Sequence, residues 1–367
     1  MQPYKHTYGT YASCWSAGGI DIRGVILAAG TGNRARPLTK SIPKALVNVA
    51  GKTLLDRNLH ALSRAGIRDM TVAIGYKATM IERYLASHEL MNRDESRVTA
   101  VRVPDYKIGP LRTALTAIES FPDDEFLIAP VDAVVSSNIL SDILNQHSKA
   151  PASMMLAVDF AAESGTPVYV RSNGLIAGIG NSVPAGDLSV GRSVMLLIAD
   201  RAIEEYSRSS LLRGESHLVP VLNQMIHDGV EVVCSDVKTQ WYDIDTLSDV
   251  LTTNSLLLRT GDVQDFDSGF LVPLGDSIKT DDRLTLNDSN IVVGEDVTIQ
   301  GPVLLTPGSR IEEKCRIGPD VTICPSARIS NGCELINTIV HDSSRVPPNS
   351  RIENAIIYGR HRYDVEL

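Results

Sequence analysis

The chain has 367 residues, 43% of them hydrophobic, which is enough for two or three domains that each bury a core. A formal net charge of -9 argues against a broad nucleic-acid-binding face, and no apolar run reaches the length of a membrane span. Five scattered cysteines without metal-ligand spacing suit a reducing, cytoplasmic compartment.

Residues 1–21 show no periodicity and lack the apolar core of a signal peptide, so we expect a flexible leader there. After them, short aliphatic runs alternate with segments whose apolar residues recur at helical spacing. This alternation predicts right-handed βαβ units and a parallel sheet, whose ligands bind beyond the carboxyl ends of the strands. Strands are predicted at 22–29, 69–74, 98–103 and 125–130, and helices at 53–65, 78–90 and 113–120.

From about Ser153 the predicted strands become shorter, and we expect them to form a mixed half of the sheet that walls a substrate pocket. The last predicted helix closes this first domain, which then spans 22–258. Residues 259–286 are rich in Asp, Gly and Ser, and we expect a linker there. The remaining strands are predicted at 153–158, 167–170, 175–179, 193–198 and 230–237, and the remaining helices at 202–207, 217–227 and 247–258.

The C-terminal stretch is a repeat, because every sixth residue from Val293 to Leu335 is aliphatic. Such hexad spacing is typical of a parallel β-helix, in which three hexads make one coil. The register slips by one residue after Leu335, and we expect three to four coils over 287–360, followed by a tail at 361–367. Cys315 and Cys333 are eighteen residues apart, so we expect them to stack inside the coils as core residues and not as a disulfide.

The first strand opens into a loop that runs from Gly30 to Lys44. Its two glycines would let backbone N–H groups approach an oxyanion, and its basic side chains stand out in an acidic chain. The loop lacks the Gly-Lys-Ser/Thr of a Walker A sequence and the third glycine of the dinucleotide fingerprint. We therefore predict a loop that binds a small phosphorylated substrate through Gly30, Gly32, Arg34, Arg36, Lys40 and Lys44.

The pattern Gly30-x-Gly32-x-Arg34-x-x-Pro37-Leu38-Thr39, followed by Pro43-Lys44, resembles the signature loop of the nucleoside-diphosphate-sugar pyrophosphorylases. These are the sugar-1-phosphate nucleotidyltransferases, and the hexad repeat is similar to the left-handed parallel β-helix attached to many of them. The resemblance implies a Rossmann-like α/β domain with a mixed, mostly parallel sheet. It also implies Mg²⁺-dependent attack of a sugar 1-phosphate on the α-phosphorus of a nucleoside triphosphate, with release of pyrophosphate.

The same resemblance assigns roles to side chains of this sequence. Arg34 would contact the departing β- and γ-phosphates, and Lys44 would meet the charge of the α-phosphate. Asp132 follows the strand at 125–130, Asp243 lies in Trp-Tyr-Asp-Ile-Asp-Thr, and both are implied Mg²⁺ ligands. The nucleotide would be bound by the first loop and by the turn before helix 113–120, through Leu27, Ala28, Ala29, Gly30, Thr31, Gly32, Asn33, Gly109 and Pro110.

Two departures from the family pattern concern the implied metal ligands. Val131 stands where the family has a glycine before Asp132. Asp245 replaces the family's glycine after Asp243, and an Asp-x-Asp pattern also occurs in cytidylyltransferases that use alcohol phosphates. Asp245 is therefore a candidate third ligand or substrate-phosphate contact, or else a helix N-cap for the segment that begins at Thr246.

Further departures concern the sugar phosphate. The segment from Gly180 to Pro184 lacks the lysine that holds this group in the family, and Arg192 is a candidate substitute. Arg112 is either extra positive charge near the substrate or an exposed side chain on a helix. Among the eight histidines, His341 at the register slip is the one candidate for acyl transfer, against the alternative of a solvent-facing loop histidine.

Three functions stay open at this point. The first is the nucleotidyl transfer described above, and the second is cytidylyl or uridylyl transfer to a polyol or choline phosphate. The third is a non-catalytic regulatory subunit that keeps the fold and binds a nucleotide sugar. In each case we expect the β-helix to be a structural module that joins copies of the chain into a homo-oligomer.

Overall fold

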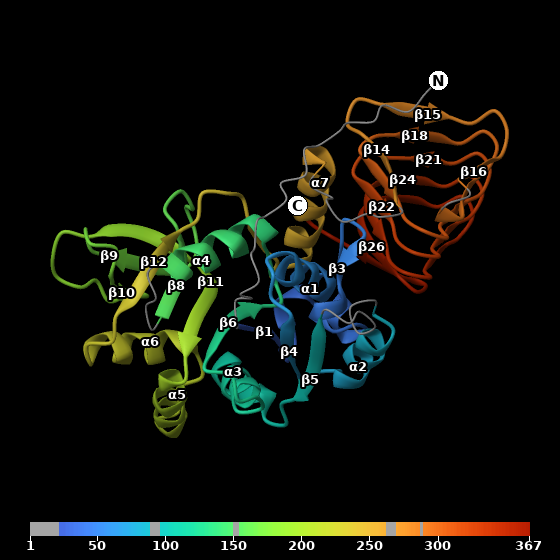
Figure 1. The fold of residues 1–367 in the computed structure, drawn as a ribbon. Helices are drawn as coiled ribbons and strands as arrows, with labels where there is room; N and C mark the ends of the chain where they lie inside the picture. Colours follow the sequence, from blue (N-terminus) through green and yellow to red (C-terminus); the bar gives the residue numbers. More distant parts are fainter. Residues whose placement is uncertain (1–21, 89–95, 150–153, 262–268, 287–288) are drawn as a thin grey trace.

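The computed structural model describes residues 22–88, 96–149, 154–261, 269–286 and 289–367, so the expected leader at 1–21 lies outside it. A sheet domain with helices on both faces meets a β-helix, and α7 (Leu247–Thr260) lies at their junction (Figure 1). None of the helices in the described ranges combines the length and the apolar character that a membrane crossing needs.

The core of the first domain is a nine-stranded sheet with the order β10-β9-β11-β6-β1-β4-β5, to which β8 and β12 are joined beside β11. The strands β1, β4, β5 and β6 are parallel, whereas β11 is antiparallel to β6, so the predicted mixed sheet is confirmed. The strands are β1 (Arg23–Ala28), β4 (Asp69–Ile74), β5 (Arg97–Arg102), β6 (Glu125–Pro130), β8 (Met154–Asp159), β9 (Pro167–Val170), β10 (Ile176–Ile179), β11 (Ser189–Asp200) and β12 (Val232–Asp236).

Helices cover both faces of this sheet, which explains why β1 is an uninterrupted apolar run. Val25 packs into one hydrophobic cluster with α3, α5 and α6, and its neighbour Ile26 packs into another with α1, α4 and α7. The predicted helices are confirmed with shifted ends, while α4 lies in a segment for which no element was predicted. The helices are α1 (Leu54–Arg64), α2 (Ala78–Ala86), α3 (Pro110–Ile118), α4 (Ser137–Lys149), α5 (Ala202–Leu212) and α6 (Leu218–His227).

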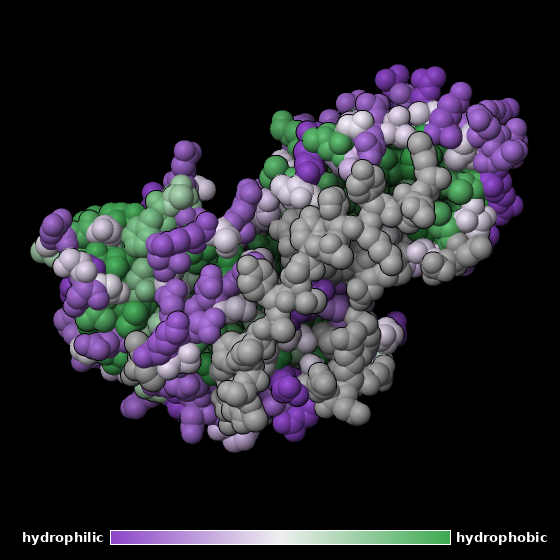
Figure 2. Space-filling model, turned by 45° about the horizontal axis from the view of Figure 1, so that its top comes forward, coloured by the Kyte–Doolittle hydropathy of each residue, from purple (hydrophilic) through white to green (hydrophobic). Residues whose placement is uncertain are grey.

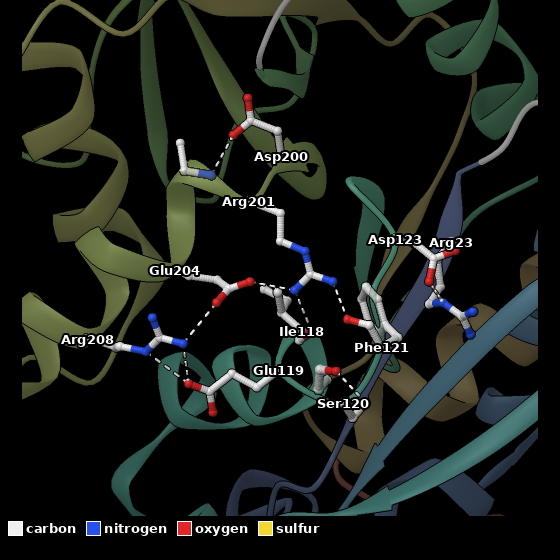
Figure 3. A network of polar contacts seen from close by, with 12 residues as sticks. Arg23, Ile118, Glu119, Ser120, Phe121, Asp123, Asp200, Arg201, Glu204 and Arg208 are labelled. Carbon is white, nitrogen blue, oxygen red and sulfur yellow. Dashed lines mark hydrogen bonds and ion pairs between the residues drawn. The ribbon is translucent and has the colours of Figure 1, made fainter.

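A polar network joins α3 to α5 at the edge of the domain (Figure 3). Arg201, directly before α5, donates to the carbonyl oxygens of Ile118 (2.9 Å) and Phe121 and pairs with Glu204. Its guanidinium also lies over the Phe121 ring, 5.1 Å from the centroid. The arginine thus satisfies a carbonyl that the end of α3 leaves without a helical partner.

The hexad residues form the interior of the β-helix, as predicted. Val293, Ile311, Ile329 and Val346 stack along one side, and the spacing between coils falls from eighteen to seventeen residues at the last pair. The thiols of Cys315 and Cys333 are buried one coil apart and unbridged, which confirms the predicted stack. The strands are β17 (Ile291–Val293), β18 (Thr298–Gln300), β19 (Val303–Leu305), β20 (Arg310–Ile311), β21 (Arg316–Ile317), β22 (Val321–Ile323), β23 (Arg328–Ile329), β24 (Glu334–Val340), β25 (Arg345–Val346) and β26 (Arg351–Tyr358).

Both ends of the β-helix differ from the prediction. Residues 259–286 are not a plain linker: α7 extends to Thr260, and three strands pair antiparallel with the first coil. The segment 361–367 is likewise no free tail, because β27 (His361–Asp364) pairs antiparallel with β26. Such short strands lack a period of their own and form only where an open sheet edge offers backbone partners. The first three are β14 (Phe270–Val272), β15 (Ser277–Lys279) and β16 (Leu284–Leu286).

One outer side of the β-helix packs on the first domain. The outward residues Leu304, Thr322, Ile339 and Ile356 form a ladder across successive coils, and all four are fully buried. Asn254 of α7 completes the joint, because its Oδ1 accepts from the hydroxyl of Thr322 (2.7 Å) and from the N–H of Ala50 (2.9 Å). This side of the β-helix is therefore an internal interface of the chain.

His341 belongs to this joint, so both interpretations offered for it above are wrong. The side chain is buried, and its Nε2 accepts a hydrogen bond from the backbone N–H of Asn48 at 2.9 Å, in β2 (Asn48–Val49). Because Nε2 accepts, the neutral ring carries its proton on Nδ1. This Nδ1 has no hydrogen-bond partner among the described residues and lies 3.8 Å from Asp342 Oδ1. The ring also meets Tyr358 edge to face.

We expect acid to weaken the joint through His341. Burial lowers the pKa of His341 from 6.5 to about 4, so between these values the folded chain binds fewer protons there than the unfolded chain. The contribution of a neutral His341 to stability is complete above pH 6.5 and is lost as the pH falls toward 4. Asp342 opposes this trend, because burial and the charge of Asp56 raise its pKa to about 6.

A comparison of the native chain with His341→Gln separates the effect of His341 on stability from that of Asp342. Glutamine offers an oxygen to the Asn48 N–H but does not titrate, so the variant keeps the effect of Asp342. Relative to the variant, the native chain should lose on the order of 2–3 kcal/mol of unfolding free energy between pH 7 and pH 4. Denaturant unfolding at several pH values measures this loss, and a difference that stays constant with pH would contradict it.

Candidate active site

The loop after β1 is compact because it folds into three short turns, η1 (Asn33–Ala35), η2 (Leu38–Lys40) and η3 (Lys44–Leu46). Gly32 has φ +61°, and a Cβ there would lie 3.0 Å from both the Thr39 and the Lys44 side chains. The Thr39 hydroxyl donates to the Gly32 carbonyl at 2.8 Å and closes the loop. By contrast, a Cβ on Gly30 would meet no protein atom within 4 Å, so this backbone is open to a ligand.

A cavity of about 980 Å³ adjoins this loop. The turn before α3 forms another part of its wall, where Gly109 has φ +139° and a Cβ would lie 2.6 Å from the Ser216 carbonyl. Ala28 and Gly32, which were predicted nucleotide contacts, do not line the cavity. Ala28 is buried in the hydrophobic core, and Gly32 lies against the side chains of Thr39 and Lys44. The other predicted contacts all line the cavity: Leu27, Ala29, Gly30, Thr31, Asn33, Gly109 and Pro110.

A second and larger cavity of about 1440 Å³ lies beside the first. Arg34, Asp132, Asp243 and Asp245 line it on one side. Residues in and around the mixed half of the sheet line it on the other, among them Asp159, Ala161 to Pro167, Ile179 to Ser182 and Trp241. Asp132 lines both cavities, so it stands where two bound molecules would meet.

Charged side chains converge on Asp132 at this point, and we call Arg34, Lys44, Asp132, Asp243 and Asp245 the charged centre. Lys44 Nζ lies 2.6 Å from Asp132 Oδ2 and 3.0 Å from Asp245 Oδ1. Arg34 Nη1 lies 2.5 Å from Asp245 Oδ2. The Lys44 side chain is 11% exposed and that of Arg34 is 72% exposed, so the lysine is fixed and the arginine can move.

Backbone pairing brings these distant segments together. The strands β7 (Ala133–Val134) and β13 (Tyr242–Asp243) are antiparallel, with Asp243 opposite Ala133. The Ile244 N–H then donates to the Asp132 carbonyl at 3.0 Å. Val131, which replaces the family's glycine, is buried, and its φ is not positive, so this turn does not require glycine.

Asp245 is not the N-cap of α7, which corrects one of the interpretations above. Thr246 is the N-cap, and it forms a capping box with Asp249. The Asp245 carboxylate points instead at Lys44 and Arg34. This leaves its two other predicted roles, as a metal ligand or as part of the phosphate site.

The carboxylates of the charged centre fit a divalent cation. One oxygen from each of Asp132, Asp243 and Asp245 lies within 4.8 Å of the others, and oxygen-only ligand sets suit hard cations such as Mg²⁺. The pKa of Asp243 rises to about 6, because the cavity walls remove part of its water and the charges of Asp132 and Asp245 repel it. Lys44 and Arg34 offset this repulsion only in part, so a bound cation would relieve it.

The two further basic candidates lie outside both cavities. Arg112 sits on α3 with its Nε buried and without a hydrogen-bond partner among the described residues. Arg192 lies in β11, where its backbone is opposite Asp159 of β8 and Pro167 of β9. Gly180, Asn181 and Ser182 do line the larger cavity, and of its described lining residues only Arg34 is a lysine or arginine.

Met195 lines both cavities and was not predicted. It has φ +64°, which is rare for a residue with a Cβ, at a register shift of β11 between Ser193 and Leu197. The Ser193 hydroxyl accepts the Met195 N–H at 3.1 Å and holds this conformation. The sequence does not indicate this conformation, because no residue type in this part of the strand predicts a bulge.

Asp159 and Trp241 fix a second wall of the larger cavity. The Trp241 Nε1–H donates to Asp159 Oδ2 at 2.9 Å. The other oxygen, Oδ1, accepts from the N–H groups of Ala161 (2.8 Å) and Ala162 (3.1 Å). Asp159 therefore positions both the loop 160–166 and the indole of Trp241. Asp159 was not predicted, because only the tryptophan belongs to a motif that can be recognised from the sequence.

Two family models match this chain, one in each of its two domains. Residues 24–195 match the MobA-like NTP transferase domain, and residues 299–363 match the GMPPB C-terminal domain. Glucose-1-phosphate thymidylyltransferase of Streptomyces antibioticus is 26% identical over 348 residues, which cover 92% of this chain and 92% of that protein. Mannose-1-phosphate guanylyltransferase 1 of Arabidopsis thaliana is 26% identical over 349 residues, which cover 92% of this chain and 86% of that protein.

Among solved structures, the inositol-1-phosphate CTP transferase from T. maritima superposes with a TM-score of 0.56 at 18% identity. The match covers 68% of this chain and 98% of that one, and it supports the fold of the first domain. The chain thus joins a nucleoside-triphosphate transferase domain to a GMPPB-type C-terminal domain, and its homologues are sugar-1-phosphate nucleotidyltransferases.

Proposed function

We propose that this chain transfers a nucleotidyl group from a nucleoside triphosphate to a sugar 1-phosphate, which gives a nucleoside diphosphate sugar and pyrophosphate. One observation carries the proposal. Two cavities meet at Asp132, and the cations and carboxylates that such a transfer requires converge there. The smaller cavity, beside the glycine loop, would take the nucleotide, and the larger one would take the sugar.

The chemistry needs alignment and charge neutralisation more than proton transfer. An oxygen of the sugar phosphate, already ionised near neutral pH, bonds to the α-phosphorus. The bond from that phosphorus to the bridging oxygen breaks, and pyrophosphate leaves with the electron pair. No general base is required, and this agrees with a charged centre made of lysine, arginine and aspartate.

Each member of the charged centre has a distinct task. Lys44, held between Asp132 and Asp245, presents fixed positive charge to the α-phosphate. Arg34 is exposed and can exchange Asp245 for the oxygens of the leaving β- and γ-phosphates. Asp132 and Asp243 would hold Mg²⁺, which supplies further positive charge to the phosphate oxygens when bound.

Two alternatives rest on specific features. A polyol or choline phosphate as acceptor would fit Asp245 and the lack of a lysine at Gly180 to Pro184. A regulatory subunit would tolerate that lack as well, but it would not need the charged centre to be complete. The sugar 1-phosphate is favoured, because the relatives that align along nine-tenths of the chain are named for that substrate.

The four cysteines of the described residues are all free, which supports the proposal of a reducing, cytoplasmic compartment.

A pyrophosphate-release assay on the full-length chain tests the function. Each common nucleoside triphosphate is combined with Mg²⁺ and with glucose 1-phosphate, mannose 1-phosphate, inositol phosphate or phosphocholine. We expect release only when a sugar 1-phosphate is present. Release with inositol phosphate or phosphocholine alone would establish the second function. No release with any pair, together with tight binding of a nucleotide sugar, would establish the regulatory subunit.

The productive pair then serves to test the charged centre. Asp132→Asn and Lys44→Ala should each lower kcat/KM by about a hundredfold or more, because each removes charge at the reacting phosphate. Asp142→Asn, on the exposed side of α4, is the matched control and should act like the native chain. A near-normal rate for Asp132→Asn would remove this residue from the metal site.

Met195 should affect the choice of acceptor, because its side chain forms part of the wall shared by the two cavities. Met195→Gly removes the side chain and relieves a left-handed strain of roughly 1–2 kcal/mol, whereas Met195→Ala removes the side chain and keeps the strain. We expect both variants to change the ratio of kcat/KM for two sugar phosphates, with the glycine variant melting at the higher temperature. An unchanged ratio in both would show that Met195 does not select the acceptor.

We further propose a homo-oligomer joined through the β-helix. One of its sides is covered by the chain's own first domain, and the stacked arginines Arg310, Arg328 and Arg345 lie on another. Figure 2 shows hydrophilic side chains along the outer rim of the β-helix and hydrophobic ones at the opposite end, near β9 and β10. Val190, an exposed residue of β11, lies opposite Tyr169 of β9 at that end of the sheet.

Sedimentation of the full-length chain measures the assembly, and two variants locate the interface. Arg328→Glu should dissociate an oligomer formed through the β-helix, and Val190→Asp should leave it intact. The reverse result would place the interface at the sheet edge, and a monomeric native chain would refute the proposed assembly.

A further inference from the structure

A second cluster of metal-ligand side chains lies away from the two cavities. Asp56 and His60 are one turn apart on α1, and His88 follows the end of α2. Figure 1 shows α1 next to β3 (Lys52–Thr53), on the side of the first domain that meets β26. Neither the nucleotide cavity nor the sugar cavity includes any of the three residues.

The three side chains point one ligand atom each at a common place. Asp56 Oδ1 lies 2.5 Å from His88 Nε2 and 3.3 Å from His60 Nε2, and all three atoms lie within 4.8 Å of one another. Ligands at about 2.1 Å from a tetrahedral zinc ion are separated by roughly 3.4 Å. The Asp56–His60 spacing already matches this value, and a small rotation of His88 would match it too.

The surroundings favour a cation at this place. The exposed fractions of the Asp56, His60 and His88 side chains are 13%, 12% and 5%. Asp56 forms ion pairs with the two histidines, and the charge of Lys52 also lowers the pKa of this carboxyl. The carboxylate of Asp342, from the β-helix, is near enough for the two aspartates to repel each other.

The capping of α1 shows that the Asp56 carboxylate bonds to the histidines and not to the N-cap of its own helix. Asp56 is the third residue of α1, whose N-cap Thr53 accepts the Asp56 N–H at 3.0 Å. In α7, Asp249 in the same position turns back to its own N-cap and forms a capping box. In α1 the carboxylate turns to the histidines instead, so the helix lacks that second capping bond.

We propose that Asp56, His60 and His88 bind a divalent transition-metal ion, with Zn²⁺ as the best fit and a water as fourth ligand. Two imidazoles and a carboxylate suit zinc, whereas Mg²⁺ prefers oxygen ligands only. The ion would tie α1 to the end of α2 beside the joint with the β-helix. Its role is structural, and the proposal does not depend on the function proposed above.

The experiment is a Zn²⁺ titration of the full-length chain, freed of metal by a chelator and kept in excess Mg²⁺. Calorimetry should give a Zn²⁺ site that His60→Ala and His88→Ala each weaken by about tenfold or more. His227→Ala, at the exposed end of α6, is the control and should bind like the native chain. Zn²⁺ should also raise the melting temperature of the native chain and of the control by more than that of the two variants.

Pyrophosphate release separates this site from the charged centre. His60→Ala should keep the native rate in excess Mg²⁺, and any Zn²⁺ bound at the charged centre should persist in both histidine variants. Should His88→Ala fail to fold, the titration of His60→Ala decides the question. Absence of Zn²⁺ binding to the native chain, or binding that both histidine variants retain in full, would overturn the proposal and leave a hydrogen-bonded His–Asp–His cluster.

Discussion

The short ladder between β7 and β13 is the constraint on which the charged centre depends. It sets Asp243 opposite Ala133 and therefore next to Asp132, although the two aspartates are far apart in the sequence. Carboxylates at this distance repel each other, as the raised pKa of Asp243 indicates. Backbone hydrogen bonds thus hold together side chains that would otherwise separate. This repulsion would favour a bound cation at the centre.

The same segment continues directly into the joint between the domains. Thr246, the N-cap of α7, directly follows Asp245. Asn254 of that helix forms a hydrogen bond with Thr322 of the β-helix. The outward ladder of the β-helix is therefore packed against the helix whose start carries the charged centre. Since α7 is capped at its start, the β-helix supports the position of Asp243 and Asp245 through Asn254, about two helical turns after the N-cap. The C-terminal domain thus contacts the helix that follows the charged centre, although none of its described residues lines either cavity.

Features set by local periodicity were predictable from the sequence. The strand before Gly30, the strand before Asp132 and the hexads of the β-helix each carry their own period or boundary residues, and the structure confirms them. The glycine loop and Asp132 could also be placed at one edge of the sheet, because parallel strands share their carboxyl ends. The motif around Asp243 was recognisable only by resemblance, and its pairing with β7 follows from tertiary structure.

Features that depend on long-range pairing escaped prediction. The strands between 270 and 286 are only three residues long, and they exist because the first coil offers an open edge. His341 looked like a surface residue, because the sequence does not reveal that the Asn48 N–H reaches it across the joint. Met195 adopts a backbone conformation that its residue type disfavours, so no propensity argument could find it. In each case the deciding partner lies in a segment far away in the chain.

The chain carries two clusters of different ligand chemistry, and the difference decides which cation each would bind. The charged centre offers oxygen atoms only, and its cation would share phosphate oxygens with a substrate that comes and goes. The cluster of Asp56, His60 and His88 offers imidazole nitrogens in a nearly buried setting, where no substrate cavity reaches. Imidazole ligands favour transition metals over Mg²⁺, so the two sites would not compete for one ion. An exchangeable cation at the reaction centre and a permanent one at the joint are therefore compatible in the same chain.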